Sequence, residues 1–141
     1  MQANHTGLQL ASWQSHLRIG GRAPRTLAEI ARAQADYEHR GRLAMIRAMA
    51  PRLAKLDELM PAMQAKGVEL HTREIVSYDG GKTLCVRRPI MSCDDKLHAA
   101  LLELGFVEVE RREFSGEIDV TLRHGRSLRV KVSIKRPQVA S

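Results

Sequence analysis

Two short segments of the chain contain residue types that carry out chemistry in other proteins. Gly81, Lys82 and Thr83 have the order that ends a phosphate-binding loop, in which backbone N–H groups and a lysine hold phosphate. Such a loop also needs a glycine five residues earlier, where this chain has Val76, and a following helix, where the chain has the strand-forming segment 84–86. We therefore interpret this segment as part of a β-hairpin turn.

The second segment contains Cys93, Asp94, Asp95 and His98, close to the start of an expected short helix. A helix N-terminus lowers the pKa of a nearby thiol, but the two adjacent carboxylates oppose that effect. We expect the aspartates to stabilise the helix start and Cys93 to be a small packing residue. The sequence thus predicts no catalytic residue, no metal ligand and no cofactor, and we expect a protein that is not an enzyme.

The clearest pattern in the chain is a row of apolar residues, here called the Met/Leu seam, at alternating spacings of three and four. This coiled-coil-like spacing predicts a helix over about residues 42–66 with one continuous apolar face. The seam is a candidate partner-binding surface, and the spacing leaves open whether a second copy, another protein or the same chain covers it. Its residues are Ile46, Met49, Leu53, Leu56, Met60 and Met63.

The seam belongs to a longer helical segment that we expect over residues 26–66. Thr26 and Glu29 form a capping-box pattern that predicts the helix start, and Gly67 predicts its end. The apolar phase slips near residues 39–41, which predicts a bend or break. At Pro51 a kinked continuous helix and a new helix remain alternatives.

From residue 67 to 136 the apolar period changes from helical to strand-like. Alternation over 68–72 and the apolar run 84–86 predict a hairpin, and Ser92 with Asp95 is expected to cap a short helix that Gly105 ends. Three alternating segments between residues 107 and 134 predict three more strands. The fold class is α+β: an N-terminal long helical segment followed by a ββαβββ unit with an antiparallel sheet.

The formal net charge of +7 is concentrated at the two ends of the 141-residue chain. All sixteen acidic residues lie between Glu29 and Asp119, and only basic charges flank them. Outward-facing basic residues on the last strands could contact phosphate or an acidic protein, or they could keep an edge strand soluble and unpaired. This basic stripe consists of Arg123, Arg126, Arg129, Lys131, Lys135 and Arg136.

The remaining segments are an expected flexible basic arm over residues 1–25 and a tail over residues 137–141. The first ten residues lack the pattern of an export signal, and no apolar run is long enough to span a membrane. The two cysteines have neither zinc-site spacing nor a disulfide pattern. We therefore expect a cytoplasmic protein without membrane contact.

These features favour a non-enzymatic interaction module that self-associates or grips a protein partner through the Met/Leu seam. Its partner would be a second copy, as in a homodimer, or another protein, with the basic surfaces facing an acidic partner. The alternative is a small nucleic-acid-binding accessory protein that contacts the phosphate backbone, because only 4% of residues are aromatic and few can stack on bases. An inhibitor protein of a virus or mobile element is a further alternative, by analogy of type.

Overall fold

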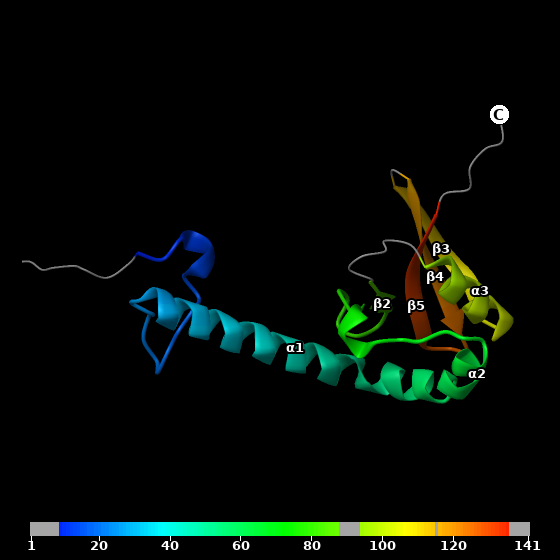
Figure 1. Ribbon diagram of the computed structural model, residues 1–141, viewed down its shortest axis with the longest axis horizontal. Helices are drawn as coiled ribbons and strands as arrows, with labels where there is room; N and C mark the ends of the chain where they lie inside the picture. Colours follow the sequence, from blue (N-terminus) through cyan, green and yellow to red (C-terminus); the bar gives the residue numbers. More distant parts are fainter. Residues whose placement is uncertain (1–8, 88–93, 115, 136–141) are drawn as a thin grey trace, which may run out of the picture. The chain divides into compact units, whose positions relative to one another are not determined.

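The computed structural model describes residues 9–87, 94–114 and 116–135, and it divides into two compact units (Figure 1). The units are Met1–Ala44 and Met45–Ser141, so their boundary falls within the first long helix. Several sequence predictions fall outside the described residues: the first eight residues of the arm, Ser92, Cys93, Arg136 and the tail.

In the first unit, residues 9–25 contain local structure that precedes helix α1 (Leu27–Asp57). A 3-10 helix, η1, spans Ser12–Gln14, and Leu17 is buried. The predicted cap is present, since the N–H of Glu29 donates to Thr26 Oγ1 at 3.1 Å. The Glu29 carboxylate accepts from the Arg25 N–H instead of closing the box on Thr26, and it pairs with Arg22 at 2.5 Å. The Arg22 and Arg25 hydrogen bonds lower the pKa of Glu29 to about 2.

Helix α1 is continuous through both positions where the sequence suggested an interruption. The predicted break near residues 39–41 is wrong, because α1 includes Gly41, and it also includes Pro51. The interruption lies instead after Asp57, before helix α2 (Met60–Ala65). Pro61 explains it: proline has no N–H to donate to the Asp57 carbonyl, and its ring crowds that carbonyl. Gly67, with φ of +76°, follows α2 as predicted.

The order of elements after α2 confirms the predicted ββαβββ unit and the α+β class. A 3-10 helix, η2, covers Thr72–Glu74, and the residues of the first strand are not those of the alternating segment 68–72. Val68 in that segment packs into the core without joining a strand. The strands are β1 (Ile75–Val76), β2 (Leu84–Val86), β3 (Val107–Phe114), β4 (Glu117–His124) and β5 (Leu128–Lys135), with helix α3 (Asp95–Glu103) between β2 and β3.

The sheet has the order β1-β2-β5-β4-β3 and is mixed, whereas the sequence predicted an antiparallel sheet. The β2–β5 pair is parallel and the other three pairs are antiparallel. The segment containing α3 carries the chain from β2 across to the far edge, a crossover that makes β2 and β3 run in the same direction. Asp94 caps α3, because its carboxylate accepts the Leu97 N–H at 3.1 Å.

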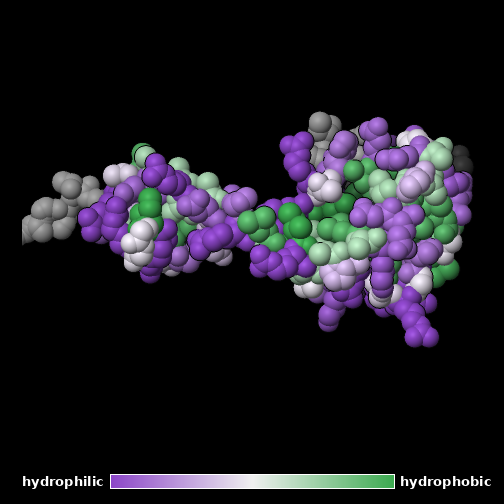
Figure 2. Space-filling view, turned by 90° about the horizontal axis from the view of Figure 1, so that it is seen from below, coloured by the Kyte–Doolittle hydropathy of each residue, from purple (hydrophilic) through white to green (hydrophobic). Residues whose placement is uncertain are grey.

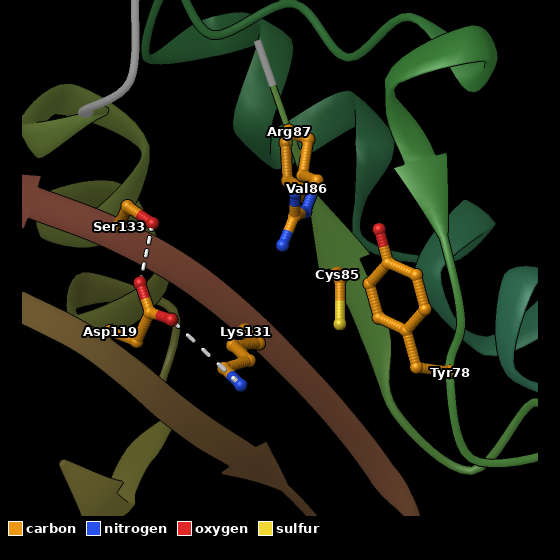
Figure 3. Close-up of a pocket in the computed structure, with 7 residues that line it drawn as sticks. All are labelled: Tyr78, Cys85, Val86, Arg87, Asp119, Lys131 and Ser133. Atoms are coloured by element: carbon orange, nitrogen blue, oxygen red, sulfur yellow. Dashed lines mark hydrogen bonds and ion pairs between the residues drawn. The ribbon is translucent and has the colours of Figure 1, made fainter. Parts of the chain in front are cut away.

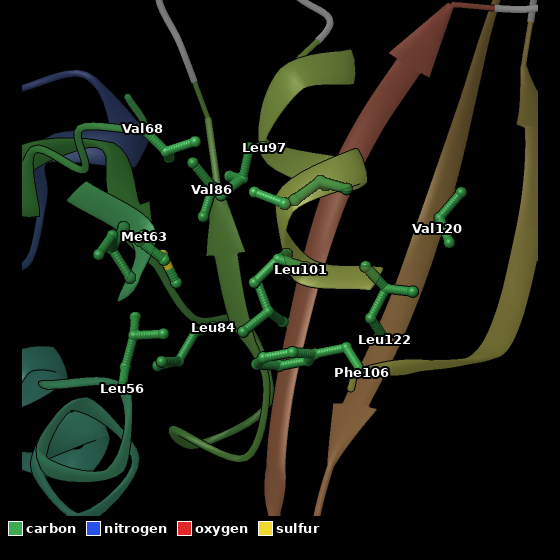
Figure 4. Close-up of a cluster of buried hydrophobic side chains, with 14 of the residues drawn as sticks. Leu56, Met63, Val68, Leu84, Val86, Leu97, Leu101, Phe106, Val120 and Leu122 are labelled. Atoms are coloured by element: carbon green, nitrogen blue, oxygen red, sulfur yellow. The ribbon is translucent and has the colours of Figure 1, made fainter. Parts of the chain in front are cut away.

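One hydrophobic core lies between the sheet and the helices of the second unit. Figure 4 shows Leu56 and Met63 of the helical segment on one side of Leu84 and Leu101 of α3 on the other. Strands β4 and β5 contribute the alternating inward residues that the sequence predicted, among them Val120, Leu122 and Val130. Figure 2 shows hydrophobic side chains interspersed with hydrophilic ones on one face of this unit.

The β1–β2 turn packs directly on the backbone of α1 at Gly81. A Cβ atom on Gly81 would lie 2.2 Å from the Ala48 carbonyl oxygen, and φ of Gly81 is +86°. The Gly81 N–H donates to Ser77 Oγ at 2.9 Å, which fixes the turn at this approach. The contact requires a residue with no side chain.

We expect Gly81→Ala to lower the free energy of unfolding by about 2 to 4 kcal/mol, because the left-handed backbone and the clash with α1 both penalise a Cβ atom. Gly80→Ala is the matched control: its φ is +72° but nothing lies within 4 Å of an added Cβ. Urea unfolding of the two variants would separate the cost of the backbone strain from the cost of the clash with α1. Equal losses would show that the close approach costs nothing beyond the backbone strain.

Candidate functional site

The Met/Leu seam lies largely in the core of its own chain. Met49, Leu56 and Met63 are 1%, 3% and 0% exposed. Leu53 and Met60 are partly buried against the same core, and Ile46 is exposed at 38%. A partner that gripped the whole seam would have to displace the sheet from it.

The structure separates the residues of the basic stripe. Arg123 and Arg129 are cross-strand neighbours on β4 and β5, and Arg126 lies in the turn between these strands. Lys131 Nζ lies 3.9 Å from Asp119, which offsets its charge, and Lys135 is exposed at the opposite end of β5. Lys135 lies six positions along β5 from Arg129, a distance of about 20 Å.

Two residues of the stripe, Arg126 and Arg129, line a hollow of about 340 Å³ that we call the basic cleft. Two further cations come from segments distant in the sequence, Arg52 from α1 and Lys82 from the β1–β2 turn. Polar groups complete the lining, namely Asp79, Thr83 and Ser127. A neighbouring hollow of about 300 Å³ shares Arg126 and Ser127 and adds Lys55 and His124.

Hydrogen bonds to one residue of the β4–β5 turn hold the helix and the turn together at the cleft. Arg52 Nε donates to the Ser127 carbonyl oxygen at 3.4 Å, and Lys55 Nζ donates to Ser127 Oγ. Arg52 and Lys55 lie one turn apart on α1 and so share a helix face. These contacts place two cations of α1 beside the cations of the turn.

Asp79 is the acidic residue of the cleft lining, and the turn already uses its carboxylate. Asp79 Oδ1 accepts from the Thr83 N–H and from Ser77 Oγ, each at 2.9 Å. Burial acts to raise the pKa of Asp79, but these hydrogen bonds outweigh it and lower the pKa. Asp79 therefore stays ionised and offsets one of the four positive charges around the cleft.

Sequence reasoning did not identify Arg52 and Lys82 as site residues. A signal for Arg52 is present in the sequence: no acidic residue occurs between Glu38 and Asp57, while five basic residues do. For Lys82 the signal was the glycine-lysine-threonine order, which marks a turn beside the cleft and not a nucleotide-binding loop.

A third, smaller hollow of about 40 Å³ lies on the face of the sheet opposite the core (Figure 3). Cys85 faces it together with Tyr78 and Lys131, and Asp119 lies between Lys131 and Ser133. Burial raises the pKa of the Cys85 thiol, which keeps it protonated and a poor nucleophile. The Arg87 guanidinium lies 5.2 Å from the centre of the Tyr78 ring. The hollow holds no more than a few water molecules.

The described residues contain no group of three or more histidine, cysteine, aspartate or glutamate side chains that could hold a metal ion. In the described part of the chain, no helix is both long and apolar enough to cross a membrane. Searches against protein-family models, curated proteins and solved structures found no match to the chain.

The burial of the seam gives a test of its structural role. Leu56→Ala should lower the free energy of unfolding by about 2 to 5 kcal/mol, because it leaves a cavity in the core. Ile46→Ala, on the exposed seam residue, should cost less than about 1 kcal/mol. Chemical denaturation measures both values. A Leu56→Ala protein with unchanged stability but altered sedimentation would instead assign the seam to an interface between chains.

Proposed function

We propose that this protein is a non-enzymatic interaction module whose basic cleft binds the phosphate backbone of nucleic acid. The observation that carries the proposal is the convergence of Arg52, Lys82, Arg126 and Arg129 from three separate segments on one hollow. Cations from distant segments raise the local positive potential above that of a scattered surface. A backbone phosphate is an anion whose oxygens accept hydrogen bonds from arginine and lysine.

The composition of the cleft favours phosphate contacts over base recognition. Its lining contains no aromatic residue among the described side chains, so it offers no platform on which bases could stack. Tyr78 lies at the neighbouring small hollow, where Arg87 approaches its ring. Binding through phosphates alone is weakly sequence-specific and falls steeply with salt.

A protein partner that grips the Met/Leu seam has less support. Met49, Leu56 and Met63 are buried, and of the six seam residues only Ile46 is exposed. The basic cleft is therefore better suited than the seam to serve as the binding surface of an interaction module. A predominantly acidic protein is the competing occupant, and it would lack the regular charge spacing of a nucleic-acid strand.

The combined substitution Arg126→Glu and Arg129→Glu tests the proposal. Affinity for a fluorescent duplex of arbitrary sequence should fall about 10- to 100-fold at about 0.1 M salt, because two phosphate contacts become repulsive. The slope of log affinity against log salt should become shallower by about 2. Fluorescence anisotropy across a salt series measures both quantities.

The control is Lys96→Glu with Lys135→Glu, which changes the formal net charge by the same amount at exposed positions outside the cleft. This control should retain most of the affinity, since phosphate held in the cleft is distant from Lys135. Equal losses in the two double variants would show that net charge alone drives binding. No binding by the unmodified protein at low salt would reject the proposal.

A further inference from the structure

Strand β3 presents an eight-residue edge to solvent. It is the last strand of the sheet order, and all its residues are exposed, including Val107 at 51% and Phe114 at 52%. The opposite edge strand, β1, has two residues. A long exposed edge strand with apolar residues is a template for pairing with another strand, and natural proteins usually shorten or block such edges.

The register with β4 shows which β3 side chains share the face opposite the core. Cross-strand partners lie on the same face of a sheet, and Asp119 and Thr121 of β4 lie between its inward core residues. The β3 residues paired with outward β4 positions therefore form one outer row. In chain order this row is Val107, Glu110, Arg112 and Phe114.

Along the strand, the residues of this outer row are apolar, acidic, basic and apolar. If a second copy of β3 runs antiparallel beside the first, each acidic residue therefore faces a basic residue of the other copy. With a two-fold axis at Arg111, Glu110 faces the partner's Arg112 and Arg112 faces the partner's Glu110. Phe114 then lies at the end of the partner strand that carries Val107. Opposite charges and apolar pairs at facing positions both stabilise strand pairing.

We propose that β3 pairs antiparallel with β3 of a second copy of this chain, centred on Arg111, to form a continuous ten-stranded sheet. The occupant follows from the charge order, because an unrelated extended peptide would not carry the reversed pattern. The interface is isologous: the same edge contributes on both sides of the axis. It is separate from the basic cleft and does not depend on the proposed function.

The opposite face of the edge tolerates the pairing. The two Arg111 side chains meet at the axis, but each is already paired with Glu108 of its own strand at 2.6 Å. Glu113, two residues from Arg111, shares that face and would lie diagonal to the partner's Arg111. The like charges at the axis are therefore flanked by acidic groups.

A β-bulge interrupts the register between Glu108 and Glu110, with Val109 as the additional residue. Bulges twist an edge strand and discourage pairing across its whole length. The segment from Glu110 to Phe114 pairs with β4 without a register shift, and it contains the charged centre of the interface. We infer that the central residues form the ladder and that the bulged ends contribute side-chain contacts.

Charge exchange at the edge tests the proposal by analytical ultracentrifugation of the full chain. The unmodified protein should show a concentration-dependent monomer–dimer equilibrium. Glu110→Arg alone and Arg112→Glu alone should each raise the dimer dissociation constant about tenfold or more, because each places like charges opposite one another twice. An equimolar mixture of these two variants should recover dimerisation as a heterodimer, and the combined exchange in one chain should recover the homodimer.

Recovery in the mixture and in the combined variant separates pairing from misfolding, since a misfolded single variant would not regain its partner on mixing. Glu103→Arg, a charge reversal of the same kind at an exposed position of α3, should leave dimerisation unchanged. A protein that stays monomeric up to about 0.5 mM, where a dimer worth more than about 5 kcal/mol would be populated, would overturn the proposal. A dimer insensitive to either single variant, or a mixture that stays monomeric, would do so as well.

A covalent probe tests the register. In a Cys93→Ser background, Arg111→Cys places a thiol on the two-fold axis, where facing strand residues are close enough for a disulfide. Oxidation should give a symmetric cross-linked dimer on a non-reducing gel. Arg112→Cys is the matched control, because position 112 faces position 110 of the partner and should cross-link little. Equal cross-linking at both positions would contradict a register centred on Arg111.

Discussion

Burial of the Met/Leu seam against the mixed sheet is the interaction on which the second unit depends. Leu56 and Met63 lie beside Leu84, and Met49 belongs to the same core, which α3 covers from its own side with Leu97 and Leu101. The seam continues in phase across the interruption at Pro61, since Met63 on α2 is as buried as Met49 on α1. The turn containing Gly81 then packs against the α1 backbone at Ala48 and fixes the helix against the sheet.

The basic cleft is a consequence of this packing. When Leu53 and Leu56 face the core, the neighbouring Arg52 and Lys55 are directed to the flank of the helix, where both reach Ser127. The contact at Gly81 brings the following residue, Lys82, to the same hollow. The same packing of α1 against the sheet thus holds both the core and the cleft together. A substitution that weakens this packing is expected to move the cations of the cleft apart as well as to destabilise the fold.

The sequence predicted the helices and strands better than it predicted how they pair and pack against one another. The strict alternation of β4 and β5 identified their inward residues, and the periodic seam identified a helix face, because both patterns are local. What covers that face was left open, since periodicity defines an apolar surface without its occupant. The parallel β2–β5 pair depends on the path of the chain through α3, which no local pattern encodes. Pro61 could have predicted the interruption, because proline breaks a helix interior. The apolar spacing of the seam continues past Pro61, however, and favoured an uninterrupted helix.

The cleft and the edge of β3 illustrate two further limits of sequence reasoning. Arg52, Lys82 and Arg126 are far apart in the chain, so only the fold could reveal their convergence. The basic stripe at the end of the chain was visible in the sequence, but Arg129 and Lys135 lie at opposite ends of β5. The self-complementary row on β3 needed the register with β4, because the bulge at Val109 changes which residues share a face.

Pairing of two chains through β3 would also affect binding at the basic cleft. A two-fold pairing of β3 would give one particle two basic clefts, and two clefts on one nucleic acid make the second binding event intramolecular. Affinity and salt dependence would then both exceed those of one cleft, because counterions are released at two sites. Weak strand pairing is sufficient for this effect, since nucleic acid that engages both clefts favours the paired state by linkage. A modest edge interface and a modest cleft would therefore support each other, and neither would have to be strong alone.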